Sequence, residues 1–507
     1  MAKKSRTEYA ARNTAVAVTA QIIAILAGYI TRVVFTHTLR EEYVGINGLF
    51  TNILSVLALS ELGIGSAVTF ALYKPVAEGD IEKQKSLMRM YRQLYRIVAG
   101  VVLISGLIVI LFMDFLVQEQ DWVEHLIVLY LIYLLNSVAS YLLIYKKALL
   151  DAHQLSYIGV LYQTAVLIMQ DLLQILVILL TKSFILYALI LIGSTLINNI
   201  CVSKKADKTY PYLKDKEVQS LSKQEKGDIY KNIRAMLIHK MGGVVVGNTD
   251  SLLLSSLVGM ISVGCYSNYY LVIGSVNQLL NQMFRAVSAS VGNLGVEESR
   301  ERIRKIFEAA FFAGQWAYGL AAICLYELID SFVRFSFGGQ FVFSKEITML
   351  LCLNFYLMGT SQAAIMFRDA LGLFRYDRYI VIIEVIVNLV VSVILGRYWG
   401  AAGVFFGTTV STVATVLWVK PYILYKYKLK CSAVKFFLRY ALYGAVTFAA
   451  WFCVDTLCRG ITGTFLVVFT GRLACCLLIT NLIYLLLYHK TEEFRLLMRK
   501  VLAFTKK

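Results

Sequence analysis

The chain has 507 residues, of which 58% are hydrophobic and only 16% charged, and its mean hydropathy is +0.66. A soluble chain of this length carries more charge, so the composition excludes an ordinary set of soluble domains. The apolar residues gather in runs of roughly 20, which as helices are long enough to cross the ~30 Å hydrocarbon core of a bilayer. These runs lack the alternation that is typical of a membrane β-barrel.

The net charge of +18 does not indicate nucleic-acid binding, because the basic residues are spread over short loops rather than gathered in one patch. The 9 cysteines show neither metal-ligand nor disulfide spacing. The sequence also contains no nucleotide-binding motif. We therefore expect no nucleic-acid partner, no metal, no cofactor and no catalytic residues.

The apolar runs predict an all-α integral membrane protein with fourteen transmembrane helices. The first run follows Lys3, Lys4, Arg6 and Arg12 and resembles a signal peptide. It is long for one and lacks a small-residue cleavage site, so we interpret it as a retained helix. The expected spans are 14–38, 46–72, 94–117, 124–145, 156–180, 183–203, 232–257, 262–290, 306–333, 346–367, 379–398, 402–424, 436–457 and 463–488.

The distribution of Lys and Arg predicts the orientation. With the N-terminus inside, 39 of the 50 basic residues fall in inner segments and 6 in outer loops. Inner loops of membrane proteins carry this excess of positive charge. An even number of spans then places both termini in the cytoplasm.

The longest inner loop, 204–231, is rich in lysine and divides six spans from the following eight. We expect an N-terminal lobe over 1–203, a cytoplasmic linker over 204–231 and a C-terminal lobe over 232–424. Two further spans occupy 425–490. The basic, amphipathic tail over 491–507 is expected to lie along the anionic inner surface of the membrane.

Five cations in or at the ends of spans are candidate ligands for an anion. Arg234 and Lys240 lie in the seventh span, where Gly243 and Gly247 permit close helix contact. They either line a wet cavity or extend to the inner interface. Arg32 lies deep in the first span, where the same two interpretations apply. The other candidates, Arg285 and Arg368, form a basic mouth or anchor their helices, and Arg368 has Asp369 as a neighbour.

Acidic residues inside spans are candidates for coupling or for the cavity wall, since an ionisable group in a span costs about 2.5–3.5 kcal/mol or more. Glu61 lies beside two glycines and could pair with Arg32 or accept a proton. Structural ion pairs and hydrogen bonds are the alternative for all of them. The four candidates are Glu61, Asp250, Asp171, which lies beside Gln170 and Gln174, and Glu384, which lies one turn from Asn388.

Several stretches resemble Wzx-type polysaccharide flippases, which belong to the MATE-like multidrug/oligosaccharidyl-lipid/polysaccharide (MOP) exporter superfamily. The resemblance covers about residues 10–430. Its motifs are VGINGLFTNILSVLALSELGIGSAVTFALYKPVAEGD (Val44 to Asp80), NTDSLLLSSLVGMISVGCYSNYYLV (Asn248 to Val272), DALGLFRYDRY (Asp369 to Tyr379), the Glu384/Asn388 pair and WGAAGVFFGTTVSTV (Trp399 to Val413).

The resemblance implies two six-helix lobes in a MATE-like V-shape with a central cavity, followed by two additional helices. It implies alternating access and a substrate such as an undecaprenyl-pyrophosphate oligosaccharide, moved across a bacterial cytoplasmic membrane for cell-surface polysaccharide synthesis. The implied partners are this lipid-linked oligosaccharide, membrane lipids, Na⁺ or H⁺ as a coupling ion, and other membrane proteins of polysaccharide biosynthesis.

Three other functions remain open from the sequence. A MATE-like ion-coupled exporter of cationic small molecules would need an acidic cavity, whereas the residues here are mixed to basic. A membrane polysaccharide polymerase or glycosyltransferase would carry a sizeable loop with acid and base residues, and the outer loops here are short. A non-transporting scaffold would tolerate neutralisation of the cations.

Overall fold

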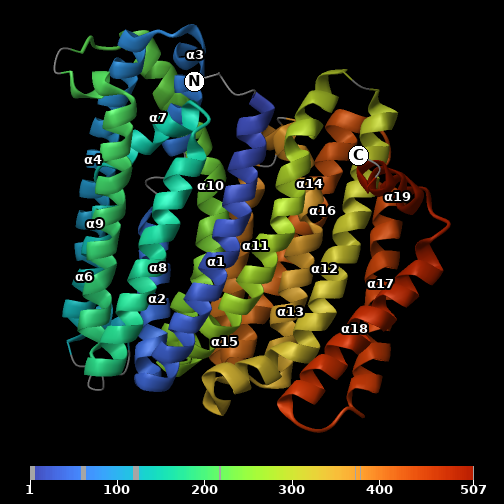
Figure 1. The fold of residues 1–507 in the computed structure, drawn as a ribbon. Helices are drawn as coiled ribbons and strands as arrows, with labels where there is room; N and C mark the ends of the chain where they lie inside the picture. The colour runs from blue at the N-terminus through green and yellow to red at the C-terminus, as the bar shows by residue number, and fades with distance from the viewer. Residues whose placement is uncertain are drawn as a thin grey trace. The chain divides into compact units, whose positions relative to one another are not determined.

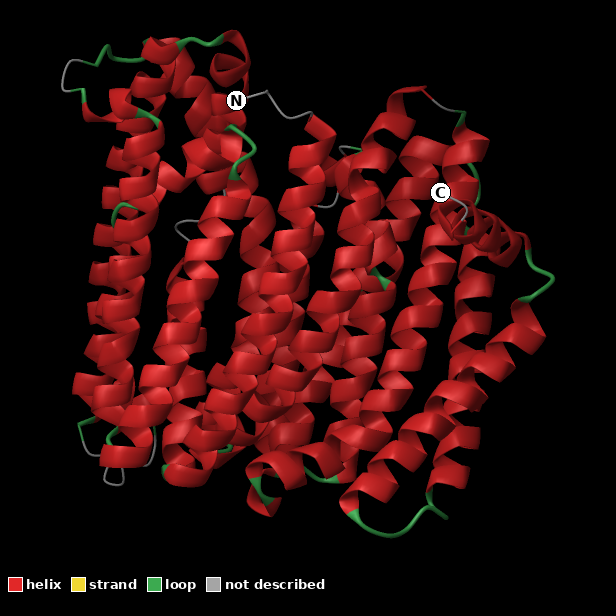
Figure 2. Cartoon of the chain, viewed as in Figure 1, coloured by secondary structure: helices red, strands yellow, loops and turns green. Residues whose placement is uncertain are grey.

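The computed structural model describes residues 6–58, 64–117, 125–215, 218–297, 299–371, 373–376 and 378–505. Within these ranges the chain consists of helices and loops without strands, as Figure 2 shows. The chain divides into two compact units, Met1–Gly264 and Cys265–Lys507. The domain limits expected from the sequence stay a prediction.

The first unit is a bundle of long helices joined by short turns (Figure 1). Its elements are α1 (Arg6–Thr38), α2 (Glu41–Leu57), α3 (Ile64–Glu78), α4 (Ile81–Ile110), α5 (Met113–Leu116), α6 (Leu126–Tyr141), η3 (Ile144–Lys146), α7 (Lys147–Ala152), α8 (Ser156–Thr181), α9 (Phe184–Thr209), η4 (Pro211–Lys214), α10 (Lys223–Leu257) and the first residues of α11 (Met260–Glu297).

The second unit is also helical (Figure 1). It contains the rest of α11, then α12 (Arg300–Phe337), η5 (Gly339–Phe341), α13 (Lys345–Thr360), α14 (Gln362–Ala370), η6 (Leu373–Tyr376), α15 (Arg378–Ala414), α16 (Val416–Ile423), the π-helical turn η7 (Leu424–Leu429), α17 (Val434–Cys458), α18 (Phe465–Tyr488) and α19 (Glu492–Thr505).

Nine helical stretches in the described part of the chain are long and apolar enough to cross a membrane. They cover ten of the fourteen expected spans, because the stretch Tyr379–Leu429 holds two. Helices α10, α11 and α12 cover three more, and at ~1.5 Å per residue each is longer than a ~30 Å hydrocarbon core. The remaining expected span, 46–72, corresponds to α2 and α3 on either side of residues 59–63, which lie outside the described part. The expectation of a multi-pass, all-α membrane protein is confirmed.

Helix α8 shows the reversed polarity of a helix in lipid. Its buried residues include Asp171 and Gln174, whereas Leu172, Leu176 and Leu180 are exposed. In water this arrangement would cost free energy on both faces, but in a bilayer the leucines contact acyl chains. Polar residues of the spans therefore mark the inside of the bundle.

A reversal at Gly400 turns α15 into two antiparallel arms. Gly400 has φ of 57°, a conformation that L-residues with a side chain rarely adopt. Ser392 on the first arm donates a hydrogen bond to the backbone carbonyl of Val404 on the second, at 3.0 Å. The arms approach so closely that a Cβ at Gly407 would meet the Ser392 backbone. The break between the expected spans 379–398 and 402–424 lies at this reversal.

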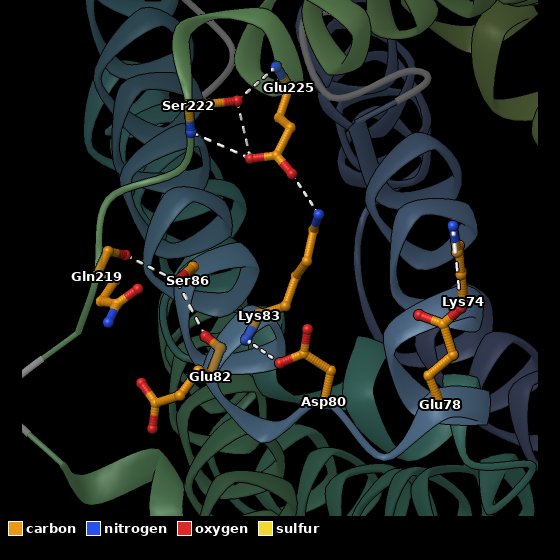
Figure 3. A network of polar contacts seen from close by, with 9 residues as sticks. All are labelled: Lys74, Glu78, Asp80, Glu82, Lys83, Ser86, Gln219, Ser222 and Glu225. Carbon is orange, nitrogen blue, oxygen red and sulfur yellow. Dashed lines mark hydrogen bonds and ion pairs between the residues drawn. The ribbon is translucent and has the colours of Figure 1, made fainter.

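The segments of the first unit that charge counting places on the inner side meet at one end of the bundle. Asn13 donates to the Gln154 carbonyl at 3.0 Å, and Lys146 pairs with Asp207 at 2.7 Å. Ser86, near the start of α4, donates to the carbonyl of Gln219 in the linker at 2.7 Å, a contact visible in Figure 3. These contacts are consistent with the prediction that the four inner segments lie on the same side of the membrane. That this side is the cytoplasmic one stays a prediction.

Helix α12 lies at the centre of the second unit and contacts α13, α14, α17, α18 and α19. Its Phe307 and Phe311 lie within a core of aromatic side chains that includes Phe436 of α17. The two C-terminal spans, α17 and α18, therefore belong to the second unit and pack on its helix α12. The basic tail forms α19, whose Phe494 stacks on Trp316 of α12 with ring centroids 5.9 Å apart.

Candidate functional site

Arg32 on α1 lies away from the exposed stripe of its helix. Residues four apart, including Ile22, Leu26 and Ile30, are exposed, whereas Thr31 and Phe35 are buried. Arg32 itself is half-buried, and its guanidinium carbon lies 5.9 Å from the centroid of the Phe35 ring. The geometry thus holds this cation within the bundle, against aromatic side chains.

Aromatic residues from three helices surround this position. Phe35 of α1 contacts Phe184 and Tyr187 of α9, with ring centroids 5.3 Å and 5.0 Å away. Tyr133 of α6 lies 6.3 Å from Phe184. Both tyrosines interact electrostatically with Arg32. A guanidinium is stabilised by about 0.5–2 kcal/mol against the face of an aromatic ring, which offsets part of its loss of water.

Asp171 is the acid of the same region. It lies on α8, is 8% exposed, and interacts electrostatically with Tyr187 of α9. Its Oδ2 atom has no hydrogen-bond partner among the described residues. Tyr187 therefore interacts with both the cation and the acid, and α1, α8 and α9 bring the three side chains together.

Hydrogen bonds from neighbouring helices fix the two tyrosines. The Tyr133 hydroxyl donates to Oδ1 of Asn47 on α2 at 2.6 Å. Gln174 donates to the backbone carbonyl of Tyr187 at 3.2 Å. Asn47 thus fixes the Tyr133 ring through its hydroxyl, and Gln174 fixes the backbone of Tyr187, so the surroundings of the cation are preformed in the first unit. Such an environment can bind an anion without large reorganisation.

Of the remaining predicted residues, three lie on α10 of the first unit: Asp250, Arg234 and Lys240. Asp250 is buried, and the adjacent Ser251 accepts a hydrogen bond from Asn52 of α2 at 2.6 Å. Arg234 and Lys240 lie on the same helix, but their side chains are outside the described part, as is that of Arg285 on α11. Glu61 belongs to residues 59–63, which the structure does not describe.

In the second unit, two predicted residues have neighbours that neutralise or fix them. Arg368 is 8% exposed and pairs with Asp369, with Nη2 and Oδ1 2.6 Å apart. Asn388 is buried and donates to the Thr408 hydroxyl at 3.0 Å across the two arms of α15. Glu384, one turn away, is half-buried.

Sequence reasoning did not identify Tyr133 and Tyr187 as neighbours of Arg32, or Asn47 as the partner of Tyr133. The chain has 32 tyrosines, and no spacing distinguishes these two. Arg32 lies more than 100 positions from both tyrosines in the sequence, so only the packing of α1, α6 and α9 reveals these contacts. The polar side chains of Asp171 and Gln174, one turn apart in an apolar span, are the sequence feature that points to this part of the bundle.

Two solved structures share this fold. Lipid II flippase MurJ in an inward closed conformation matches with a TM-score of 0.67 and 13% identity, covering 94% of this chain and 98% of that chain. A MATE-family multidrug resistance transporter of the MOP superfamily, in an inward-facing conformation, matches with a TM-score of 0.63 and 15% identity, covering 80% and 94%. At these identities the likeness concerns the fold, which is that of a multi-pass helical membrane protein.

Residues 10–289 match the family model described as polysaccharide biosynthesis protein, which is more than half of the chain. The chain belongs to this family. The resemblance predicted from the sequence is thereby confirmed at the level of the family and the fold, and the protein is a multi-pass membrane protein of the polysaccharide biosynthesis family. A comparison with curated proteins finds no match.

Proposed function

We propose that this protein is a flippase that moves a lipid-linked oligosaccharide of the undecaprenyl-pyrophosphate type across the bacterial cytoplasmic membrane by alternating access. The observation that supports this most directly is Arg32, a cation held among Phe35, Tyr133 and Tyr187 inside a membrane-spanning bundle. Retaining a charge at such depth costs about 2.5–3.5 kcal/mol or more, which favours a functional role.

A pyrophosphate headgroup carries the charge opposite to that of this cation. Its oxygens can accept paired hydrogen bonds from the planar guanidinium, an arrangement that Lys cannot reproduce. We assign Arg32, Lys240, Arg234, Arg285 and Arg368 as headgroup ligands.

The acids are assigned to energy coupling. Without a nucleotide-binding motif, the driving force must come from Na⁺ or H⁺, from the membrane potential or from removal of the product. Asp171 is the described candidate whose geometry fits best, because one buried carboxylate oxygen lacks a hydrogen bond within the described ranges. Glu61, Asp250 and Glu384 are the other candidates. Both termini are assigned to the cytoplasm on the distribution of Lys and Arg.

Transport in proteoliposomes tests this function. We expect wild-type protein to move a fluorescent undecaprenyl-pyrophosphate oligosaccharide between leaflets, and Arg32→Ala to slow this by about tenfold or more, the effect of losing one charge-assisted contact. Arg32→Lys should lie between the two. Lys74→Ala, which removes an exposed charge from the same unit, is the matched control and should behave as wild type.

Two results would contradict the proposal. One is equal flipping by wild type, Arg32→Ala and empty liposomes. The other is efflux of a cationic dye such as ethidium, with no lipid-linked substrate moved, which would indicate a MATE-like small-molecule exporter instead.

A further inference from the structure

A second cation-rich site lies outside the membrane-spanning part of the first unit. A cavity of about 600 Å³ opens between the start of α4, the turn after α6 and the linker. Five cations line it, against a single carboxylate, that of Asp215. The cations are Lys85, Arg89 and Arg92 of α4, Lys146 of η3 and Lys214 of η4.

The linker forms one wall of this cavity and is held by specific contacts. Tyr212 donates to Oε1 of Gln84 at 2.6 Å, and Asp215 pairs with Lys85 at 2.7 Å. Burial raises the pKa of Tyr212 to about 12, so its hydroxyl stays protonated and keeps donating. Arg89 donates to the Val218 carbonyl at 3.1 Å.

The next contacts along the linker are drawn in Figure 3. Ser86 donates to the Gln219 carbonyl, and Lys83 of α4 pairs with Glu225 at the start of α10. The wall is thus joined to α4 at intervals over two turns of helix. The cavity is a built feature of the fold rather than a gap beside a loose loop.

Two of the five cations are already neutralised. Lys85 pairs with Asp215, and Lys146 contacts both carboxylate oxygens of Asp207 at 2.7 Å. Arg92 and Lys214 are exposed, and neither forms an ion pair within the described ranges. They therefore present unneutralised charge to whatever enters the cavity.

Membrane orientation alone requires cations on the inner side but does not require them to converge. Here three segments far apart in the sequence place them around one space whose volume suits a small ligand. We propose that this cavity binds a phosphate-bearing group, either the headgroup of an anionic lipid or a soluble phosphate compound, with Arg92 and Lys214 as its principal ligands. The site is separate from the Arg32 region and does not depend on the proposed transport function.

The test uses the full chain in phosphatidylcholine nanodiscs. Sodium pyrophosphate is titrated by calorimetry at constant ionic strength as the soluble probe. In a second arm, phosphatidylglycerol is mixed into the nanodiscs and its retention is measured by native mass spectrometry. The double variant Arg92→Gln/Lys214→Gln should weaken binding about tenfold in at least one arm, as expected for two lost charge contacts.

The matched control is Lys204→Gln/Lys208→Gln, which removes two exposed charges from the end of α9 without changing the lining of the cavity. It should bind like wild type. The swapped variant Arg92→Lys/Lys214→Arg keeps the charge and should retain binding, and unliganded unfolding midpoints verify that all variants fold. Binding in this cavity should persist in Arg32→Ala, which separates it from the proposed transport site.

The arms also distinguish the source of the phosphate. Loss of pyrophosphate binding alone indicates a soluble compound, and loss of phosphatidylglycerol retention alone indicates a lipid headgroup. Equal binding by wild type, the double variant and the control in both arms, or no binding in either arm, overturns the proposal.

Discussion

The ammonium of Lys83 on α4 pairs with the carboxylate of Glu225 on α10, and Ser222 holds the same carboxylate in a capping box (Figure 3). The Glu225 carboxylate accepts from the backbone N–H of Ser222 at 3.1 Å, and the Ser222 hydroxyl accepts from the backbone N–H of Glu225 at 3.2 Å. The Glu225 side chain therefore both caps the start of α10 and connects it to the start of α4.

This relationship predicts how the start of α10 responds to pH. The hydrogen bond from Lys83, followed by those from Ser222, lowers the pKa of Glu225. A lowered pKa in the folded state means that the stabilisation is present above the unfolded pKa of about 4.3 and is lost as pH falls through the folded value. Hydrogen exchange of residues 219–230 should therefore accelerate as pH falls below about 4, after correction for intrinsic rates.

The variant Glu225→Gln should reproduce part of this loss at neutral pH. Both side chains of the pair are more than a third exposed, so solvent screens it and the cost should be only about 0.5–1 kcal/mol. Glu78→Gln, which alters an exposed pair within α3, is the control. Unchanged exchange at the start of α10 in Glu225→Gln would contradict the prediction.

Asp171→Asn should leave folding intact and change the coupling of transport. Asn keeps the shape of the side chain, and the Oδ2 atom of Asp171 has no hydrogen bond to lose among the described residues. If the carboxylate takes up the coupling ion, flipping by wild type should depend on pH or Na⁺, and this dependence should disappear in the variant. Transport rates at several pH values, with and without Na⁺, measure this, and a variant with the wild-type dependence would exclude Asp171.

Gly407→Ala should destabilise the second unit by roughly 1–3 kcal/mol, because the added methyl group meets the Ser392 backbone on the other arm of α15. Gly444→Ala is the matched control, since no described atom outside its own helical turn lies within 4 Å of the place that the new methyl group would take. A better helix former there should be neutral or stabilising by up to about 1 kcal/mol. Thermal unfolding in detergent compares the two, and equal midpoints would show that the arms separate easily.

Arg439 of α17 joins the tail helix to the body of the second unit. Its Nη1 atom lies 3.0 Å from Glu308 of α12 and also pairs with the buried Glu493 of α19. Arg439→Leu leaves Glu493 uncompensated and should cost about 1–3 kcal/mol. Arg439→Leu/Glu493→Leu removes both charges and should be milder than the sum of the single variants. Limited proteolysis of α19 and unfolding midpoints measure the cycle, and strict additivity would argue against a coupled pair.

The amino-acid sequence by itself determined the class of this protein. Apolar runs of membrane length, separated by short basic loops, indicate the spans, because a bilayer requires helices with internally bonded backbones. The same reasoning located Arg32 and Asp171, since a charge in a span is conspicuous. It also separated the two arms of α15, because the run is interrupted around Gly400.

The partners of those charges were decided only by tertiary structure. Tyr187 interacts with Arg32 and Asp171 because α9 packs beside α8, which packs beside α1. Likewise, Arg92 and Lys214 line one cavity because the linker folds back on α4. Such contacts depend on which helix faces meet, and hydrophobic periodicity cannot specify this where lipid-facing and core-facing residues are equally apolar.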